Sequence, residues 1–281
     1  MKKIVAIFQI AVLTAGLSAT DVVIEALGSN QAFDENGETK AELPSFGAAI
    51  RISDKIQENL EGSISYESDP AYGNTLSARA SLRTSYMEVS AGPSFGVMNQ
   101  GSTEGAVGVL FQPGLGIGFS VTVPGIVVAR ADTDFALPAP GDTGGKVYLQ
   151  RSSATAGFYL PNVLCSAGIH QRINTESGNR ISGTTDYGFY AEAFRKGSSF
   201  RIGMDFIYRV MDYYVAPDHA DNRKLGNLVI GGGLTWAPKA DFSVFAKGNG
   251  ALYTFSLGDP VDGLEQFLFD FRGGVRFQIG N

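Results

Sequence analysis

The sequence predicts an all-β protein, a transmembrane, antiparallel up-and-down β-barrel of about 14 strands, with 12 as the alternative count. Three observations support this prediction. Apolar and polar residues alternate with a period of two along most of the chain. Long and short segments alternate between these stretches, as do the connections of a membrane barrel. The N-terminus has the composition of a secretory signal peptide.

The composition suits a protein with an apolar outer surface. Only 18% of the residues are charged, and Gly occurs 36 times. A low charge content leaves enough uncharged residues to keep one face of every strand apolar. The net charge of −6 offers no basic surface for a phosphate backbone, so nucleic acid is excluded as a partner.

Residues 1–19 form the predicted signal peptide. Lys2-Lys3 precede an apolar run from Ile4 to Leu17, and Ser18-Ala19 provide small residues for cleavage before Thr20. The alternative is an uncleaved N-terminal anchor, but the run is short for a membrane span. Beyond it, no run approaches the ~20 apolar residues of a transmembrane helix, so the mature chain could cross a membrane only as a barrel. We expect residues 20–281 to form that single domain.

The alternation defines strands separated by turn-forming residues. In the last strand Phe267, Phe269 and Phe271 share one face, and Asp270 and Arg272 lie on the other. In the first half of the chain we expect strands at 21–29, 46–53, 56–66, 76–82, 87–95, 107–111 and 115–123. In the second half we expect them at 146–159, 163–172, 187–193, 200–210, 228–236, 242–252 and 267–279.

Long polar segments and short turns connect these strands in regular succession. We expect long loops at 31–43, 67–74, 99–104, 131–145, 211–226 and 256–263. Between them we expect tight turns at 54–55, 84–85, 113–114, 161–162, 195–199 and 238–239. A barrel of this kind has its short turns at one end, its longer loops at the other, and both termini at the turn end.

Aromatic residues on the apolar faces fall near the strand ends, where membrane barrels carry aromatic girdles. We expect one girdle, near the loop end, to contain Tyr66, Tyr187, Tyr208 and Phe267. The other girdle, near the turn end, would contain Phe200, Trp236, Phe242 and Phe277.

A secreted, soluble β-sandwich is the alternative, because its sheets also bury one face. Many of the predicted strands reach the ~9 to 11 residues of a tilted membrane crossing, whereas strands of globular proteins are usually ~5 to 6 residues long. The opposite faces also carry much Gly, Ser and Ala besides charge. Both features favour the barrel.

The polar faces would line the lumen, and they carry both signs of charge. The candidate lumen-lining residues are Glu61, Arg79, Arg83, Glu88, Arg172, Glu192, Arg201, Asp205, Arg209, Lys247, Asp270, Arg272 and Arg276. Cross-strand pairing accounts for some of them, as we expect for Glu192 and Arg201. A barrel of this strand number is too wide for side chains to fill easily, which favours a water-filled pore with weak ion selectivity over a filled lumen.

The leader, the dyad repeat, the loop asymmetry and the aromatic-rich last strand together resemble the outer-membrane β-barrels of bacteria, over the whole mature chain. By strand count the chain looks like the monomeric fourteen-stranded porins. Members of this class usually end on an aromatic assembly signal, whereas this chain ends Phe277-Gln278-Ile279-Gly280-Asn281, a partial match. The resemblance implies the outer membrane as location, a monomer, and lipid, the barrel-assembly machinery and small-molecule solutes as partners.

No enzymatic motif of this class fits. Outer-membrane phospholipases and deacylases resemble one another in placing a Ser two residues after a His, but Arg172 follows His170 at that spacing and Asp221 follows His219. Asp218 and His219 lie in a loop, where outer-membrane proteases carry such residues, but with a different spacing. We therefore expect no catalytic residue, no metal site and no cofactor.

Three functions agree with these features. The first is a porin or channel for passive uptake of small solutes, since the predicted lumen is polar. The second is a carrier of hydrophobic molecules, for which residues 20–43 would have to provide the plug. The third is a surface adhesin or structural barrel acting through the acidic loops 31–43, 131–145 and 211–226.

Overall fold

The structure of the chain is a computed structural model, which describes residues 20–30, 44–69, 73–100, 108–136, 139–140, 146–147, 149–175, 180–215, 220–257, 260, 264 and 267–279. The predicted signal peptide and the predicted loop at 31–43 lie outside the described residues. The regular elements of the described part are all β-strands. No helix in that part is long and apolar enough to cross a membrane.

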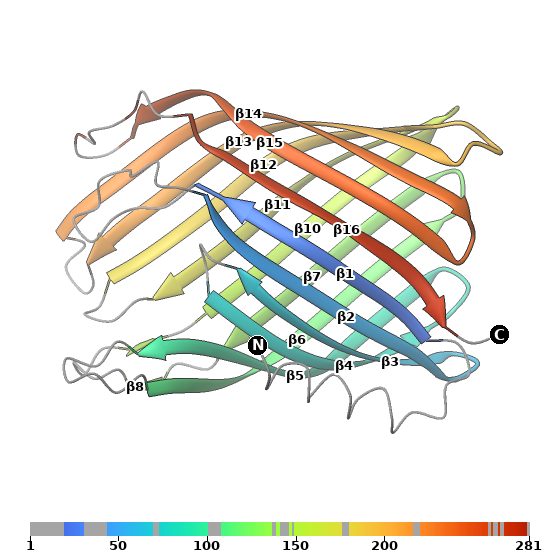
Figure 1. The fold of residues 1–281 in the computed structure, drawn as a ribbon, viewed down its shortest axis with the longest axis horizontal. Helices are drawn as coiled ribbons and strands as arrows, with labels where there is room; N and C mark the ends of the chain where they lie inside the picture. The colour runs from blue at the N-terminus through green and yellow to red at the C-terminus, as the bar shows by residue number, and fades with distance from the viewer. Residues whose placement is uncertain are drawn as a thin grey trace.

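Fourteen strands form one closed antiparallel barrel, as predicted (Figure 1). The barrel closes where β1 (Thr20–Ser29) pairs with β16 (Phe269–Ile279), from Thr20 opposite Ile279 to Ser29 opposite Asp270. The other barrel strands are β2 (Ser45–Gln57), β3 (Leu60–Asp69), β4 (Gly73–Arg83), β5 (Met87–Gln100), β6 (Gly108–Val123), β7 (Val127–Ala136), β10 (Leu149–Leu160), β11 (Val163–Thr175), β12 (Arg180–Phe194), β13 (Phe200–Val215), β14 (Ala220–Lys239) and β15 (Phe242–Ser256). A separate two-stranded sheet pairs β8 (Ala139–Pro140) with β9 (Lys146–Val147).

The two ends of the barrel differ in their connections. Short turns join β2 to β3, β4 to β5, β6 to β7 and the later pairs at one end, on the right in Figure 1, which we call the turn end. Thr20 and Ile279, the outer residues of the closing pair, also lie there. The other ends of the strands lie at the opposite end of the barrel, which we call the loop end. This arrangement is typical of outer-membrane barrels.

Each strand presents an apolar outer face and a polar inner face. On β3 the outward Ile64 is 52% exposed, whereas its neighbour Ser63 lines an internal cavity. On β13 the outward Ile202 and Phe206 are 58% and 48% exposed. Exposed apolar residues on all sides of a closed barrel would be unstable in water, because no described part of the chain covers them. The outer face is therefore the lipid-facing surface of a transmembrane barrel.

A compact apolar cluster occupies part of the inner side near the loop end. It consists of Ile207, Met211, Leu225, Val229, Ala251 and Leu268. Leu225 is fully buried and Leu268 is 2% exposed. A bulge of β15 opposite the Leu228–Val229 step lets Ala251 join this inner cluster while Tyr253 faces outward. These residues provide a local core between β13, β14, β15 and the start of β16.

The predicted count of 14 strands was correct, although one predicted turn and one predicted loop were wrong. The expected turn at Pro113-Gly114 lies inside β6, and the expected loop at 131–145 overlaps β7, so one split strand and one missed strand offset each other. Pro113 is tolerated because β6 has no β7 partner there: the β6–β7 pairing begins at Gly114 opposite Ala136. In β7 the charged residues Asp132 and Asp134 face inward, so they resemble loop residues in the sequence.

Other boundaries also differ from the prediction. The turn expected at Asp54-Lys55 lies at residues 58–59, because Asp54 and Lys55 pair with Gly62 and Glu61 as ordinary strand residues. The loop expected at 67–74 is shorter, since β3 continues to Asp69 and β4 begins at Gly73. The loop expected at 211–226 is replaced in large part by the ends of β13 and β14. Inward Glu67 and Asp69 extend β3, whereas inward Met211 and Leu225 of the apolar cluster extend β13 and β14.

An introduced arginine should affect the stability of the barrel differently on the two faces of β3. We expect Ile64→Arg to destabilise the barrel by about 2–4 kcal/mol, because the charge would enter the hydrocarbon region. Ser63→Arg, one residue away, should change the stability by less than about 1 kcal/mol, because its side chain enters a water-accessible cavity. Urea unfolding of the barrel refolded into lipid vesicles measures both values, and equal losses would contradict the assigned faces.

Candidate functional site

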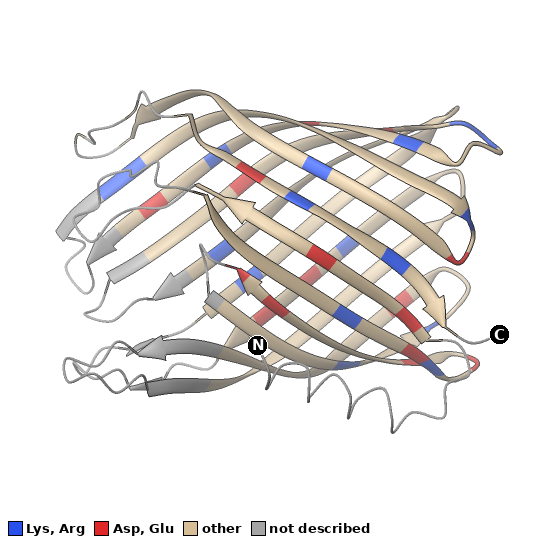
Figure 2. Ribbon diagram, in the orientation of Figure 1, with Lys and Arg blue, Asp and Glu red and all other residues tan. Residues whose placement is uncertain are grey.

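The inner side of the barrel contains cavities lined by charged side chains. A cavity of about 430 Å³ lies toward the loop end, and we call it the loop-side cavity. A second cavity of about 920 Å³, the turn-side cavity, is lined by residues near the short turns, and it shares Asp132 and Asp134 with the first. A third, of about 400 Å³, is lined by residues of β7 and of β10 to β13 near the turn end. Figure 2 shows that the charged residues lie within the strands rather than only at their ends.

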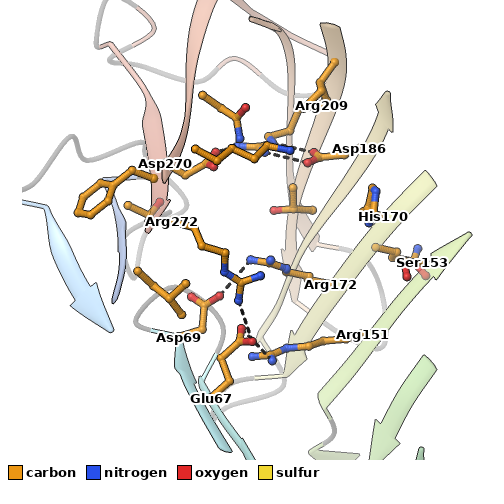
Figure 3. Close-up of a pocket in the computed structure, with 18 of the residues that line it drawn as sticks. Glu67, Asp69, Arg151, Ser153, His170, Arg172, Asp186, Arg209, Asp270 and Arg272 are labelled. Atoms are coloured by element: carbon orange, nitrogen blue, oxygen red, sulfur yellow. Dashed lines mark hydrogen bonds and ion pairs between the residues drawn. The ribbon is translucent and has the colours of Figure 1, made fainter. Parts of the chain in front are cut away.

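Ion pairs cross the lumen at the loop-side cavity. Glu67 and Asp69, the last inward residues of β3, face Arg151 of β10 and Arg172 of β11 (Figure 3). Arg151 Nη1 lies 2.9 Å from Glu67 Oε1, and Arg172 Nη1 lies 3.0 Å from Asp69 Oδ2. Five strands separate β3 from β11 on one side and seven on the other, so the second pair joins nearly opposite strands of the barrel. These contacts narrow the lumen at this level.

Arg272 of β16 joins this group from a third direction. Its Nη2 atom lies 3.0 Å from Glu67 Oε2 and 3.3 Å from Glu25 Oε2 of β1. Glu67 and Asp69 are two positions apart on one strand, so their carboxylates share a face, about 7 Å apart along the strand. Three guanidinium groups therefore meet two neighbouring carboxylates. We call Glu67, Asp69, Arg151, Arg172 and Arg272 the cross-lumen network.

A second cluster centres on Arg209 of β13. Its Nε and Nη2 atoms donate to Asp186 at 2.6 Å and 2.8 Å, and its Nη1 atom donates to Asp270 at 2.6 Å. Asn249 Nδ2 donates to the other oxygen of Asp270 at 2.7 Å. The bidentate contact fixes the guanidinium plane, and the Arg209 side chain is only 8% exposed. This cluster is a rigid part of the wall.

Lys247 and two rings complete this wall. Lys247 Nζ lies 2.6 Å from Asp205 Oδ2 and 5.3 Å from the centroid of the Tyr190 ring, within the range of a cation–π contact. The His170 ring meets Tyr190 edge to face, with centroids 5.7 Å apart. The loop-side cavity is thus lined by charged groups, aromatic rings and a few apolar side chains.

Toward the turn end, the charged side chains pair along the wall. Arg79 of β4 reaches over β5 and β6 to Asp132 and Asp134 of β7. Gly116 permits this path, because a Cβ atom there would clash with the Asp134 and Arg79 side chains. Arg83 Nη2 lies 2.8 Å from Glu88 Oε2. These pairs leave the centre of the turn-side cavity open.

The structure distributes the predicted lumen residues among these places. Arg172, Arg209, Lys247, Asp270 and Arg272 line the loop-side cavity. Glu61, Arg79, Arg83, Glu88 and Arg276 line the turn-side cavity. Glu192 and Arg201 line the third cavity, where Arg201 Nη1 lies 3.3 Å from Glu192 Oε1. Asp205 is buried beside Lys247.

Several charged partners were absent from the prediction. Glu67, Asp69, Asp132 and Asp134 fell into segments taken as loops, and Arg151 belongs to a strand with weak alternation. The missed signal was the spacing itself. Pairs of acids at i and i+2 at the end of an alternating stretch continue its period of two, so they belong to one face of a strand.

The predicted girdle residues lie on outer faces. Phe200 and Trp236 stack with centroids 6.4 Å apart near the turn end, and Phe242 begins β15 there. Tyr187 and Tyr208 stack at the same distance, farther toward the loop end. Phe267 is 62% exposed. Tyr66 and Phe277 lie on the outer faces of β3 and β16. The contact of these rings with lipid headgroups stays a prediction.

No group of three or more His, Cys, Asp or Glu side chains suited to a metal ion occurs among the described residues. Asp218 and His219, which the sequence places together, lie outside that part of the chain.

The fold is shared with known barrels, although the sequence is not. No protein-family model and no curated protein matches the sequence. A Pseudomonas aeruginosa FadL homologue aligns with a TM-score of 0.50 and 9% identity, covering 92% of this chain and 89% of its own. A monoaromatic hydrocarbon channel, CymD, aligns with a TM-score of 0.49 and 8% identity, covering 95% of this chain and 89% of its own. OmpT, an outer membrane protein of Vibrio cholerae, aligns with a TM-score of 0.43 and 10% identity, covering 93% of this chain and 97% of its own. This chain shares the barrel fold of the FadL homologue.

The burial of the cross-lumen network predicts its contribution to stability. We expect Glu67→Gln to lower the free energy of unfolding by about 1–3 kcal/mol, because two guanidinium groups lose their carboxylate. Glu192→Gln should cost at most about 1 kcal/mol, because its pair with Arg201 is 40% and 61% exposed. Urea titrations of both variants in vesicles provide the test, and a larger cost for Glu192→Gln would contradict the assignment.

Proposed function

We propose that the chain forms a narrow channel of the bacterial outer membrane, through which small polar solutes diffuse. The observation that supports this function best is the lumen, where cavities of about 430 and 920 Å³ adjoin each other at Asp132 and Asp134 and are lined by charged and hydroxyl side chains. The apolar outer face supports a membrane location, and export would depend on the predicted leader.

The cross-lumen network sets the size limit in this proposal. Arg151, Arg172 and Arg272 reach β3 from other parts of the barrel, so a solute must pass beside their ion pairs. Charged side chains at a constriction select solutes by size and charge. We therefore expect small conductance steps rather than those of a wide pore.

The inner apolar cluster gives little support to a carrier of hydrophobic molecules. Leu225 and Leu268 pack against their neighbours and are almost fully buried, so they form a core rather than the wall of an apolar cavity. The loop-side cavity is lined by six Asp and Glu side chains and five Arg and Lys side chains, which an apolar molecule would have to desolvate. A polar solute keeps hydrogen-bond partners there.

Planar-bilayer recordings of the refolded mature chain test the channel and its constriction. The double variant Glu67→Ala/Arg151→Ala keeps the net charge and removes a pair that crosses the lumen, so we expect larger single-channel steps. Glu192→Ala/Arg201→Ala removes a pair between adjacent strands and should leave the steps unchanged. A folded barrel without conductance would contradict the channel, and unchanged steps in the first variant would contradict the position of the constriction.

A further inference from the structure

Three of the five cations that line the loop-side cavity are clearly more exposed than the acids paired with them, whereas Arg209 and Arg151 are not. In the pair of Arg172 with Asp69, the arginine side chain is 40% exposed and the aspartate 9%. In the pair of Lys247 with Asp205, the corresponding values are 43% and 8%. Arg272 is 36% exposed, against 19% for Glu67. A solute in this cavity therefore meets positive groups, although the numbers of acidic and basic residues are nearly equal.

The surroundings of these three side chains strengthen the bias. Two further guanidinium nitrogens, Arg151 Nη2 and Arg272 Nε, are buried and have no hydrogen-bond partner within the described part of the chain. These donors add positive potential to the cavity wall, and the buried acceptor Asn249 Oδ1, also without a partner in that part, partly offsets it. A guanidinium group is also a planar fork that matches the two oxygens of a carboxylate.

Carboxylates also line the cavity, and their positions restrict where an anion can bind. Asp270 is 29% exposed and is held by Arg209. Asp132 is 49% exposed and pairs with Arg79 where the loop-side and turn-side cavities adjoin. The most accessible acid therefore lies at the border toward the turn end, and the exposed cations lie on β11, β15 and β16.

Apolar and aromatic side chains line the same cavity. Leu27 and Ile207 are 8% and 7% exposed, and the Tyr190 ring lies under Lys247. A volume of about 430 Å³ falls in the range of pockets for small organic ligands. Because Leu27 and Ile207 are almost fully buried, the Tyr190 ring would be the main apolar contact of a compact organic body whose anionic group meets the cations.

We propose that the loop-side cavity is a binding site for small organic carboxylates with a compact apolar body, with Arg172, Lys247 and Arg272 as the groups that bind the anion. The site rests on the proposed channel and defines the class of solute that it favours. Its carboxylate would replace water at the exposed guanidinium and ammonium groups, which already have their structural counterions.

Benzoate, benzyl alcohol and benzylammonium test this proposal, because they share one ring and differ in charge. Binding of each is measured by calorimetry on the wild-type barrel in detergent micelles, and block of the current is measured in planar bilayers. We expect benzoate to bind at least about tenfold more tightly than benzyl alcohol, equivalent to about 1.4 kcal/mol. Benzylammonium should bind most weakly. Equal binding of the three probes would overturn the proposal without any variant.

Charge variants then locate the site. Arg172→Gln and Arg272→Gln should each weaken benzoate binding about tenfold, the size expected for one charge-assisted hydrogen bond. Asp132→Asn should strengthen it, because it removes the most exposed carboxylate of the cavity. Arg201→Gln removes a cation that is 61% exposed outside this cavity and should have no effect. Equal weakening by Arg201→Gln would overturn the location, since it would indicate a general effect of charge.

The two readouts separate this inference from the channel itself. Conductance without preferential benzoate binding would overturn the binding site and leave the channel intact. Benzoate binding that depends on Arg172 in a barrel without conductance would support the site and contradict the channel. Loss of folding in a variant is detected by the heat-induced shift of the barrel on gels, and the wild-type comparison of the three probes then decides.

Discussion

Ion pairs across the lumen are the interaction on which the inner structure depends. A barrel of 14 strands encloses more space than its inward side chains can fill with an apolar core, so polar groups must cross it and satisfy one another. Arg151, Arg172 and Arg272 provide this crossing because their long side chains can reach β3. Glu67 and Asp69 provide a pair of acceptors on one strand face.

The same contacts connect architecture with selectivity. Asp69 and Glu67 are less exposed than Arg172 and Arg272, so these pairs stabilise the barrel while part of each arginine stays in contact with water. The wall built around Arg209 is rigid and buried, and it holds Asp186 and Asp270 in place. On β16, Asp270 belongs to this wall, and Arg272, two residues farther along the strand, belongs to the cross-lumen network.

The sequence predicted the barrel well and its charged constriction only in part. Alternation is a local property of the sequence. The outer face could therefore be predicted without knowing which strands are adjacent, as in the stretches Ile202 to Phe206 and Phe267 to Phe271. The charges that meet across the lumen are determined by strand register and barrel closure, and no local sequence pattern predicts these two features. Glu67, Asp69, Asp132 and Asp134 also resembled loop residues, because acids at strand ends are common in turns. Closure brings β3 opposite β11, and only the folded barrel shows it.

A double-mutant cycle between Asp69 and Arg172 tests the central claim most directly, because the two residues lie on nearly opposite walls. Unfolding free energies of Asp69→Asn, Arg172→Gln and the double variant in vesicles yield the coupling energy. A contact across the lumen predicts a coupling of about 1 kcal/mol. Additive effects, with no coupling beyond error, would show that the pair does not form and that the lumen is not crossed at this level.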